Sequence, residues 1–190
     1  MTRGYDMSLR SRLADETRDR ILEATERLLA HEPIGSVTLA AIADEAGVSV
    51  QTVLRHTGSR SGCFELVAER VRERIHEQRG GTEPGDVDGA LEGLLLHYEV
   101  EGTLVLSLLA QEKVDPTAGE AVREGRAYHR AWVERHLGPC LAEGGRETID
   151  ALVAATDIYV WKLLRLDLGR SKADARRVMH RLVTSILEAP

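Results

Sequence analysis

The side chains best suited to binding chemistry lie in the segment "GVSVQTVLRHTGSR", residues 47–60. Gln51 carries an amide that can pair with adenine, and Arg55 a guanidinium that can pair with guanine or with a phosphate. Val50 and Thr52 are suited to contact a thymine methyl group. These residue types indicate recognition of base edges in duplex DNA. The plainer alternative is that Gln51 and Arg55 are solvated surface residues.

A second group of hydroxyl-bearing and basic residues is suited to contact the sugar–phosphate backbone instead: Thr38, Ser49, His56 and Arg60. Ser49 also stands where a helix begins, so its hydroxyl can accept from a free backbone amide close to where a phosphate would lie. Phosphate contacts of this kind position a protein on DNA, whereas base contacts specify the sequence.

Two short helices must position these residues, one over 38–46 and one beginning after Ser49. Gly47 permits a left-handed turn between them, and Val48 can fill the angle that they enclose. This is the plan of a helix-turn-helix, in which the first helix braces across the DNA backbone and the second enters the major groove. Amphipathic patterns predict a longer helix on each side, over 15–32 and 59–79.

The remaining chain is also predicted to be helical, so the fold class is all-α. A Gly-rich loop over 79–89 separates the two parts. Beyond it, residues 88–115 predict two helices that part near Gly102, and residues 117–137 predict another. A helical pair follows over 146–169 and 171–189, joined at Gly169 and Arg170, with Ser171 as the N-cap.

The charge balance limits the classes of partner. The 190 residues carry a net charge of −6, which argues against coating nucleic acid by bulk attraction. Residues 1–80 are nearly neutral, with 12 basic and 13 acidic side chains, so the acidic excess lies in the other part of the chain. A local DNA-binding face is therefore compatible with the acidic total.

Other classes of protein find little support. Cys63 and Cys140 lie far apart without a CxxC pattern, which indicates reduced thiols, and the N-terminal residues lack the apolar core of a signal peptide. His97 and Glu101 interrupt the most apolar run, which makes it a poor membrane span. These two residues lie four apart, but without a third ligand we predict no metal. We also find no nucleophile–base pair and no phosphate loop, so we expect a cytoplasmic protein that is not an enzyme and has no cofactor.

The segment "RILEATERLLA…VTLAAIADEAGVSVQTVLRHTGSRSGCFELV", residues 20–67, resembles the DNA-binding domain of the TetR family of transcriptional regulators. The resemblance implies a helix-turn-helix domain over 15–60 and an effector-binding and dimerisation domain over 61–190. Residues 1–14 would form a flexible arm, in which Arg3, Arg10 and Arg12 add phosphate contacts, or else a plain disordered terminus. The sequence departs from the family at Leu54, where a Tyr is usual, and at Thr57, where an aromatic residue is usual.

The resemblance also implies a small-molecule effector site in the C-terminal domain. Amphipathic aromatic residues suited to such a cavity are Tyr98, Tyr128, Trp132 and Trp161. Candidate polar groups are His97, His129, Asp157 and Cys140. The alternative is that the tryptophans belong to the core and that the histidines form hydrogen bonds within the fold.

The last two predicted helices carry apolar stripes that include Leu163, Val178 and Leu182. They can complete the core of their own chain, or pack against a second copy as a four-helix bundle, which the resemblance favours. A homodimer implies a roughly palindromic operator. We therefore expect a repressor that a small-molecule effector releases from DNA. The alternatives are an effector-independent dimeric DNA-binding protein and an all-α enzyme that uses the C-terminal pocket.

Overall fold

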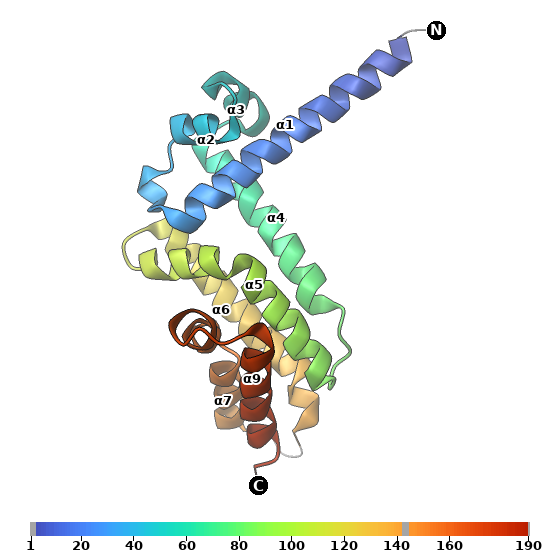
Figure 1. Ribbon diagram of the computed structural model, residues 1–190, viewed down its shortest axis with the longest axis vertical. Helices are drawn as coiled ribbons and strands as arrows, with labels where there is room; N and C mark the ends of the chain where they lie inside the picture. The colour runs from blue at the N-terminus through green and yellow to red at the C-terminus, as the bar shows by residue number, and fades with distance from the viewer. Residues whose placement is uncertain (1–2, 142–144, 190) are drawn as a thin grey trace. The chain divides into compact units, whose positions relative to one another are not determined.

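The computed structural model describes residues 3–141 and 145–189, with side chains from Arg12 onward, and the regular elements in these ranges are helical (Figure 1). The chain divides into two compact units, Met1–Arg72 and Glu73–Pro190, here called the N-terminal and C-terminal units. The predicted all-α fold is confirmed. The division falls inside helix α4 (Arg60–Gly80), whereas we placed the boundary between residues 60 and 61, at the start of that helix.

The N-terminal unit contains α1 (Arg3–His31), the 3-10 turn η1 (Ile34–Ser36), α2 (Leu39–Ala46), α3 (Val50–Thr57) and the first part of α4. Apolar side chains spaced three or four residues apart form its core, as expected for amphipathic helices. The buried members include Ile21, Ala24 and Leu29 of α1, Ile42, Ala43 and Ala46 of α2, Val53 of α3, and Cys63 and Val67 of α4.

Helix α1 begins at Arg3, so residues 3–14 have a helical backbone where we expected an arm without regular structure. The composition explains this correction. Residues 5–14 contain no Pro or Gly, and Leu, Arg and Ala in this segment are favourable helix formers that continue the helix predicted from residue 15.

The C-terminal unit contains the end of α4, α5 (Val87–Gln111), α6 (Pro116–His136), the 3-10 turn η2 (Gly138–Cys140), α7 (Arg146–Ala155), α8 (Ile158–Lys162), the π-helical turn η3 (Leu163–Asp167) and α9 (Lys172–Leu187). The predicted joint before α9 is confirmed, because Gly169 has a φ of 63° and the Ser171 hydroxyl accepts from the Asp174 amide at 3.1 Å. The predicted Gly-rich loop lies between the end of α4 and the start of α5.

Helix α5 is continuous, which corrects the prediction of two helices that part near Gly102. Gly102 is buried, and a Cβ atom added there would lie 2.6 Å from the ring of Trp161. The residue is therefore a contact point for an aromatic ring and not a helix end. Glycine lowers helix propensity by about 1 kcal/mol, which close packing can outweigh.

The helix predicted over 146–169 is instead divided into α7, α8 and η3. The division begins at Thr156 and Asp157. The Asp157 carboxylate accepts from the Tyr159 amide at 2.8 Å, which caps α8, while the Thr156 carbonyl accepts from the hydroxyl of Tyr98 at 2.9 Å. Asp competes for backbone amides in this way and so favours helix starts over helix interiors.

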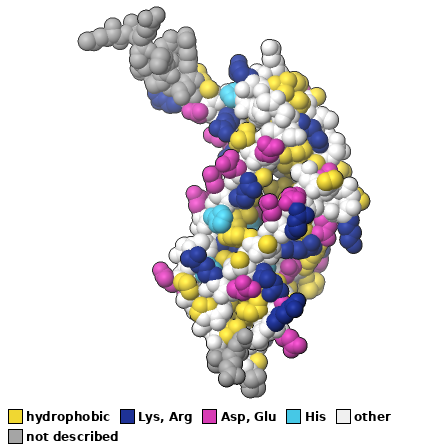
Figure 2. Space-filling view, turned by 180° about the vertical axis from the view of Figure 1, so that it is seen from behind, with side chains coloured by type: hydrophobic (Ala, Val, Ile, Leu, Met, Phe, Trp, Pro, Cys, Tyr) yellow, Lys and Arg dark blue, Asp and Glu magenta, His cyan; other side chains and the backbone are white. Residues whose placement is uncertain are grey.

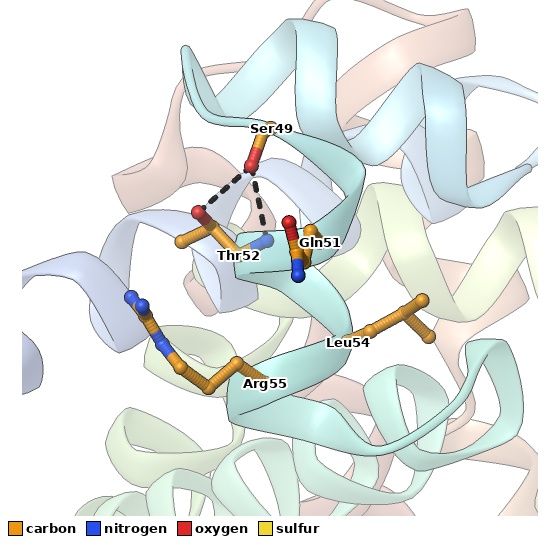
Figure 3. Close-up of a pocket in the computed structure, with 5 residues that line it drawn as sticks. All are labelled: Ser49, Gln51, Thr52, Leu54 and Arg55. Carbon is orange, nitrogen blue, oxygen red and sulfur yellow. Dashed lines mark hydrogen bonds between the residues drawn. The ribbon is translucent and has the colours of Figure 1, made fainter.

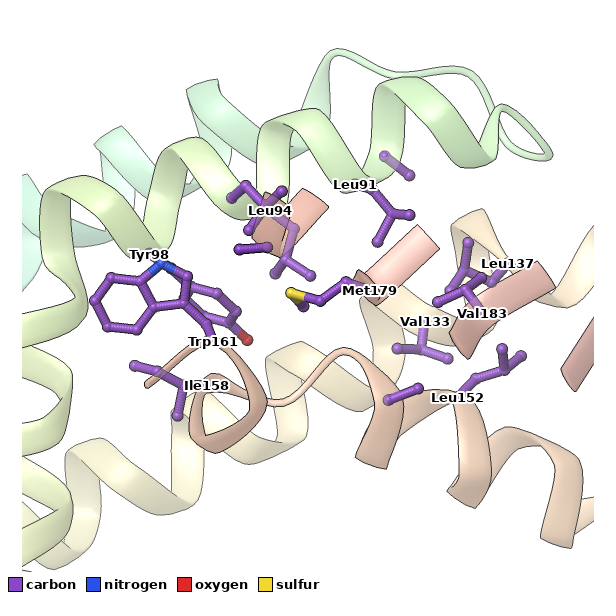
Figure 4. Close-up of a cluster of buried hydrophobic side chains, with 14 of the residues drawn as sticks. Leu91, Leu94, Tyr98, Val133, Leu137, Leu152, Ile158, Trp161, Met179 and Val183 are labelled. Carbon is purple, nitrogen blue, oxygen red and sulfur yellow. The ribbon is translucent and has the colours of Figure 1, made fainter. Parts of the chain in front are cut away.

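The core of the C-terminal unit is an apolar cluster contributed by α5, α6, α7, α8 and α9 (Figure 4). Leu91, Leu94 and Leu95 of α5 are fully buried in it, and Met179 of α9 lies among them. By length and composition α5 is apolar enough to cross a membrane. Its leucines, however, pack into this cluster, which makes it the central helix of the unit.

Candidate functional site

Helices α2 and α3 are joined by a turn whose backbone is set by Gly47. This residue has φ 63° and ψ 41°, in the left-handed region that favours glycine. The amide of Val48 donates to the carbonyl of Ala43 at 2.9 Å, so the end of α2 is hydrogen-bonded, and Val48 is half-buried. The helix-turn-helix that the sequence predicts is therefore formed.

Hydroxyl groups cap both helices of the motif. The Thr38 hydroxyl accepts from the Ala41 amide at 3.1 Å, and the Ser49 hydroxyl accepts from the Thr52 amide at 3.1 Å. The Ser49 and Thr52 hydroxyls also lie 2.9 Å apart (Figure 3). Ser49 and Thr38 remain exposed, so capping fixes the backbone of both helix starts without removing these hydroxyls from the surface.

The exposed face of α3 carries the residues predicted to contact bases. Gln51, Leu54 and Arg55 are exposed, and together with Ser49 and Thr52 they line a shallow hollow (Figure 3). Positions three and four apart share one side of a helix, which is why these side chains emerge together while Val53 is buried. Val50 is also exposed, and so offers an apolar contact at the helix start.

Arg55 differs from Arg27 and Arg70 of the N-terminal unit because it makes no ion pair or hydrogen bond with the described residues. Arg27 pairs with Glu45 at 2.8 Å, and Arg70 lies within 4 Å of Asp19 and Glu23. Basic and acidic side chains also lie close together on the face drawn in Figure 2, with hydrophobic side chains between them. The Arg55 guanidinium is thus available to an external acceptor, whereas Arg27 and Arg70 already have carboxylates beside them.

Arg60 and His56, which we assigned to phosphate contacts, have their side chains turned into the domain. The Arg60 guanidinium donates to the carbonyls of Val37, at 2.6 Å, and Ile34, and its carbon lies 4.7 Å from the centroid of the Phe64 ring. These bonds connect α4 to the turn before α2. His56 is half-buried, and its Nε2 atom has no hydrogen-bond partner among the described residues.

The two departures from the family pattern have different structural settings. Leu54 is 39% exposed on the hollowed face of α3. Thr57 is half-buried, and its hydroxyl bonds to the Val53 carbonyl at 3.0 Å and accepts from the buried thiol of Cys63 at 3.2 Å. A Cβ at Gly62 would lie 2.0 Å from the Thr57 carbonyl oxygen, so α4 approaches the end of α3 closely. Burial raises the pKa of the Cys63 thiol, which keeps it a hydrogen-bond donor.

The predicted effector residues lie in the C-terminal unit, where most of them are buried. Tyr98 and Trp161 have ring centroids 6.0 Å apart, and the Trp161 indole donates to Glu99 at 2.9 Å. Trp132 donates to the carbonyl of Arg79 at 3.2 Å. Asp157 caps α8 as described above, and Cys140 is half-buried with its sulfur 3.4 Å from the carbonyl oxygen of Gly85.

Arg79 lies at the centre of a buried polar cluster that sequence reasoning missed. Its guanidinium carbon lies 4.4 Å from the ring centroid of Trp132 and 5.1 Å from that of Tyr128. Its Nη2 donates to His129 Nδ1 at 2.9 Å. A signal existed in the sequence, because Val67, Val71 and Ile75 mark one face of α4, and the next position of that series is Arg79.

The hydrogen bonds of His129 determine which of its two ring nitrogens carries the proton. Arginine is only a donor, so Nδ1 of His129 must accept and the hydrogen of the neutral ring is on Nε2. That atom lies 3.1 Å from the Thr156 hydroxyl, which donates in turn to the Leu152 carbonyl at 2.7 Å. Burial, with the charge of Arg79, lowers the pKa of His129 to about 4. The imidazole is therefore neutral at pH 7.

His97 and Glu101 lie on α5 and are also buried. Burial, with the charges of Arg79 and His129, lowers the pKa of His97 to about 3, and its Nδ1 has no hydrogen-bond partner among the described residues. Glu101 accepts from Arg74 at 2.7 Å through one oxygen only. Among the described residues no group of three or more His, Cys, Asp or Glu side chains is arranged to hold a metal, so His97 and Glu101 lack a third ligand there.

Comparison with known proteins gives a family match in the N-terminal part of the chain. Residues 21–67 match the model of the bacterial regulatory proteins of the tetR family. The HTH-type transcriptional regulator AlkX of Mycobacterium tuberculosis is 28% identical over 99 residues. That match covers 52% of this chain and 44% of AlkX, so it spans less than half the length of that curated relative.

The fold of the chain also has solved counterparts. A structure described as a TetR-family transcriptional regulator from Rhodococcus sp. matches with a TM-score of 0.66 at 18% identity, over 91% of this chain and 100% of that one. The multidrug binding protein EbrR, complexed with imidazole, matches with a TM-score of 0.52 at 21% identity, over 88% and 89%. The helix-turn-helix segment of this chain therefore matches the tetR family of bacterial regulatory proteins, and the fold of the chain is similar to that of solved structures described as TetR-family transcriptional regulators.

Proposed function

We propose that this regulator represses transcription by placing α3 in the major groove of an operator. The proposal rests on one observation. Gln51 and Arg55 are both exposed on α3 of a capped helix-turn-helix, and neither side chain makes a hydrogen bond or ion pair with the described residues. Gln51 would read adenine, and Arg55 guanine or a phosphate, while Val50 and Thr52 would contact thymine methyl groups. Ser49 and Thr38 would bind phosphates from exposed helix starts.

The test is selection of operators from random duplex DNA, followed by titration of the selected site. Gln51→Ala with Arg55→Ala should weaken specific binding by about 30-fold or more, because each of the two bidentate contacts contributes roughly 1–3 kcal/mol. Arg27→Ala, which removes an exposed arginine that is paired with Glu45, is the matched control and should change affinity little. Unchanged affinity and sequence preference in the double variant would exclude direct readout by α3.

We further propose that the protein acts as a homodimer on a roughly palindromic operator. Exposed apolar side chains on α8, η3, the following turn and α9 support this proposal: Tyr159, Leu163, Leu166, Leu168, Val178 and Leu182. Helix α9 thus has two apolar faces, since Met179 and Val183 are buried in the core of their own chain. A two-fold axis would set two α3 helices about one DNA turn apart.

Release from the operator would follow from binding of a small-molecule effector in the C-terminal unit. EbrR, which shares the fold, is a multidrug binding protein. Helix α4 supports a connection, because it carries Arg79 near one end and, near the other, Gly62 and Cys63, which contact Thr57 of α3. The effector would favour a conformation of the dimer in which the two α3 helices fit DNA poorly.

Two other functions make different predictions. An effector-independent DNA-binding dimer would keep its operator affinity in the presence of any compound that binds the C-terminal unit. An all-α enzyme would turn over a bound compound. We propose neither of these functions. We propose instead a cytoplasmic regulator whose partners are DNA, its effector and a second copy of itself. We expect it to need no cofactor, metal or membrane.

A further inference from the structure

The charge of Arg79 lacks a counter-ion. Its side chain is buried, with 3% of its surface exposed, and its contacts are a neutral histidine and two aromatic rings. No carboxylate of the described residues lies within ion-pair distance of it. A buried charge without a partner costs several kcal/mol, so such a group is retained where something else compensates it.

The buried charges around Arg79 do not cancel. Glu101, which is 1% exposed, pairs with Arg74 at 2.7 Å, and that pair is neutral. His97 and His129 are uncharged at pH 7, as shown above. One positive charge therefore remains in excess among these groups, which a single monovalent anion would balance.

Unused hydrogen-bond donors lie in the same region. Arg79 Nε, which can only donate, has no partner among the described residues, and neither has His97 Nδ1, which can donate in one tautomer. Burying a donor without a partner costs about 1–3 kcal/mol. An acceptor that carries negative charge would satisfy Arg79 Nε and balance its charge at once, and charge-assisted bonds of this kind are the stronger ones.

We propose that the C-terminal unit binds a monovalent organic carboxylate whose charged group meets Arg79. This inference rests on the proposed effector function and names the chemical class of the effector. The planar guanidinium matches the fork of a carboxylate, and one uncompensated positive charge matches a monoanion better than a phosphate dianion. The rings of Tyr128 and Trp132 provide an apolar surface for the rest of the molecule.

Such a ligand would reach Arg79 by passing the ring of Tyr128. This ring is only half-buried, in contrast to Trp132 and His129 on the other sides of Arg79. Its neighbour His76 is exposed and meets it edge-on with ring centroids 4.9 Å apart. Rotation of these two side chains would expose the guanidinium with the least disturbance of the core.

The first test uses the unmodified protein and pairs of compounds that differ only in charge. Acetate, benzoate and octanoate are compared with acetamide, benzamide and octanamide, by thermal unfolding and by fluorescence at pH 7. At least one acid should raise Tm saturably and change the emission of Trp132, whereas its amide should do neither. Equal effects of acids and amides, or no effect of any acid, would overturn the proposal.

The second test removes the charge. Arg79→Met should weaken binding of the active acid about tenfold or more, Arg79→Lys should retain part of it, and Arg146→Met, at a fully solvated arginine of the same unit, should leave it unchanged. Equal binding in Arg79→Met and the unmodified protein would overturn the proposal even if other variants fail to fold.

Operator titrations with and without the active acid separate this inference from the proposed function. DNA binding without any acid-specific Tm shift would refute the carboxylate site and leave the repressor intact. An acid that binds through Arg79 but leaves operator affinity unchanged would confirm the site and refute the effector mechanism.

Discussion

Arginine serves three purposes in this protein, and its surroundings determine which. Arg55 is exposed and free to contact DNA, Arg60 holds α4 against backbone carbonyls before α2, and Arg79 is a buried charge among aromatic rings. We had assigned both Arg55 and Arg60 to DNA, Arg55 to guanine or a phosphate and Arg60 to the sugar–phosphate backbone. The difference arises because Arg60 lies within reach of the backbone carbonyls of Ile34 and Val37.

The buried histidines make stability depend on pH. His97 and His129 have pKa values of about 3 and about 4 in the folded protein, whereas an unfolded histidine titrates near 6.5. Between these values the unfolded state binds more protons, so the free energy of unfolding should fall as the pH drops from about 6.5 towards 4. Urea unfolding at pH 7, 6 and 5, followed by tryptophan fluorescence, measures this effect.

Substitutions identify the groups responsible. His129→Gln should make the dependence on pH shallower, because one of the groups with a lowered pKa is removed. His31→Gln, at an exposed histidine of the other unit, should leave the dependence as it is. A curve for His129→Gln that runs parallel to that of the unmodified protein would contradict the assignment.

At the scale of elements, local patterns predicted the helix-turn-helix well and the interior of the C-terminal unit less well. The glycine turn and the serine cap act within four residues, so the sequence alone indicates them. Gly102 was misjudged because its role depends on a residue that is distant in the sequence. Whether a glycine ends a helix or receives a ring depends on Trp161, which lies 59 residues away in the sequence.

Two glycine substitutions should therefore act in opposite directions. Gly102→Ala should destabilise the protein by about 1–3 kcal/mol, because its Cβ would overlap the Trp161 ring. Gly125→Ala, within α6 and with no atom within 4 Å of the added Cβ, should stabilise it by about 0.5–1 kcal/mol. Denaturant titration compares the two, and a neutral Gly102→Ala would mean that Trp161 does not pack as described.

At the scale of the whole molecule, the exposed apolar side chains of η3 and α9 are the feature that a single chain leaves unexplained. Leu163 and Leu166 are 50% and 56% exposed, and Val178 and Leu182 are each 41% exposed. Several large apolar side chains exposed on elements that contact one another are typical of an interface. A second copy of the chain that covers these side chains would explain why α9 has a second apolar face.

Replacing Val178 and Leu182 together by Glu should convert a dimer into monomers, because four like charges would meet across a two-fold interface. Sedimentation at a fixed concentration measures the change, and operator affinity should fall with it. Val114→Glu is the control, since Val114 is the most exposed of the large apolar side chains described and lies outside this face. A double variant that sediments like the control would exclude this face as the interface.

The sequence by itself determined the helical fold, the helix-turn-helix and the residues that α3 exposes, because periodicity, caps and turns depend on neighbours within one or two helical turns. It also carried the family resemblance, which the comparisons confirm. Only the tertiary structure decided that Arg60 faces inward, that Gly102 receives a ring and that Arg79 is buried beside His129. Those outcomes depend on partners 23 to 59 residues away, such as the 50 residues between Arg79 and His129, and only packing brings such partners together.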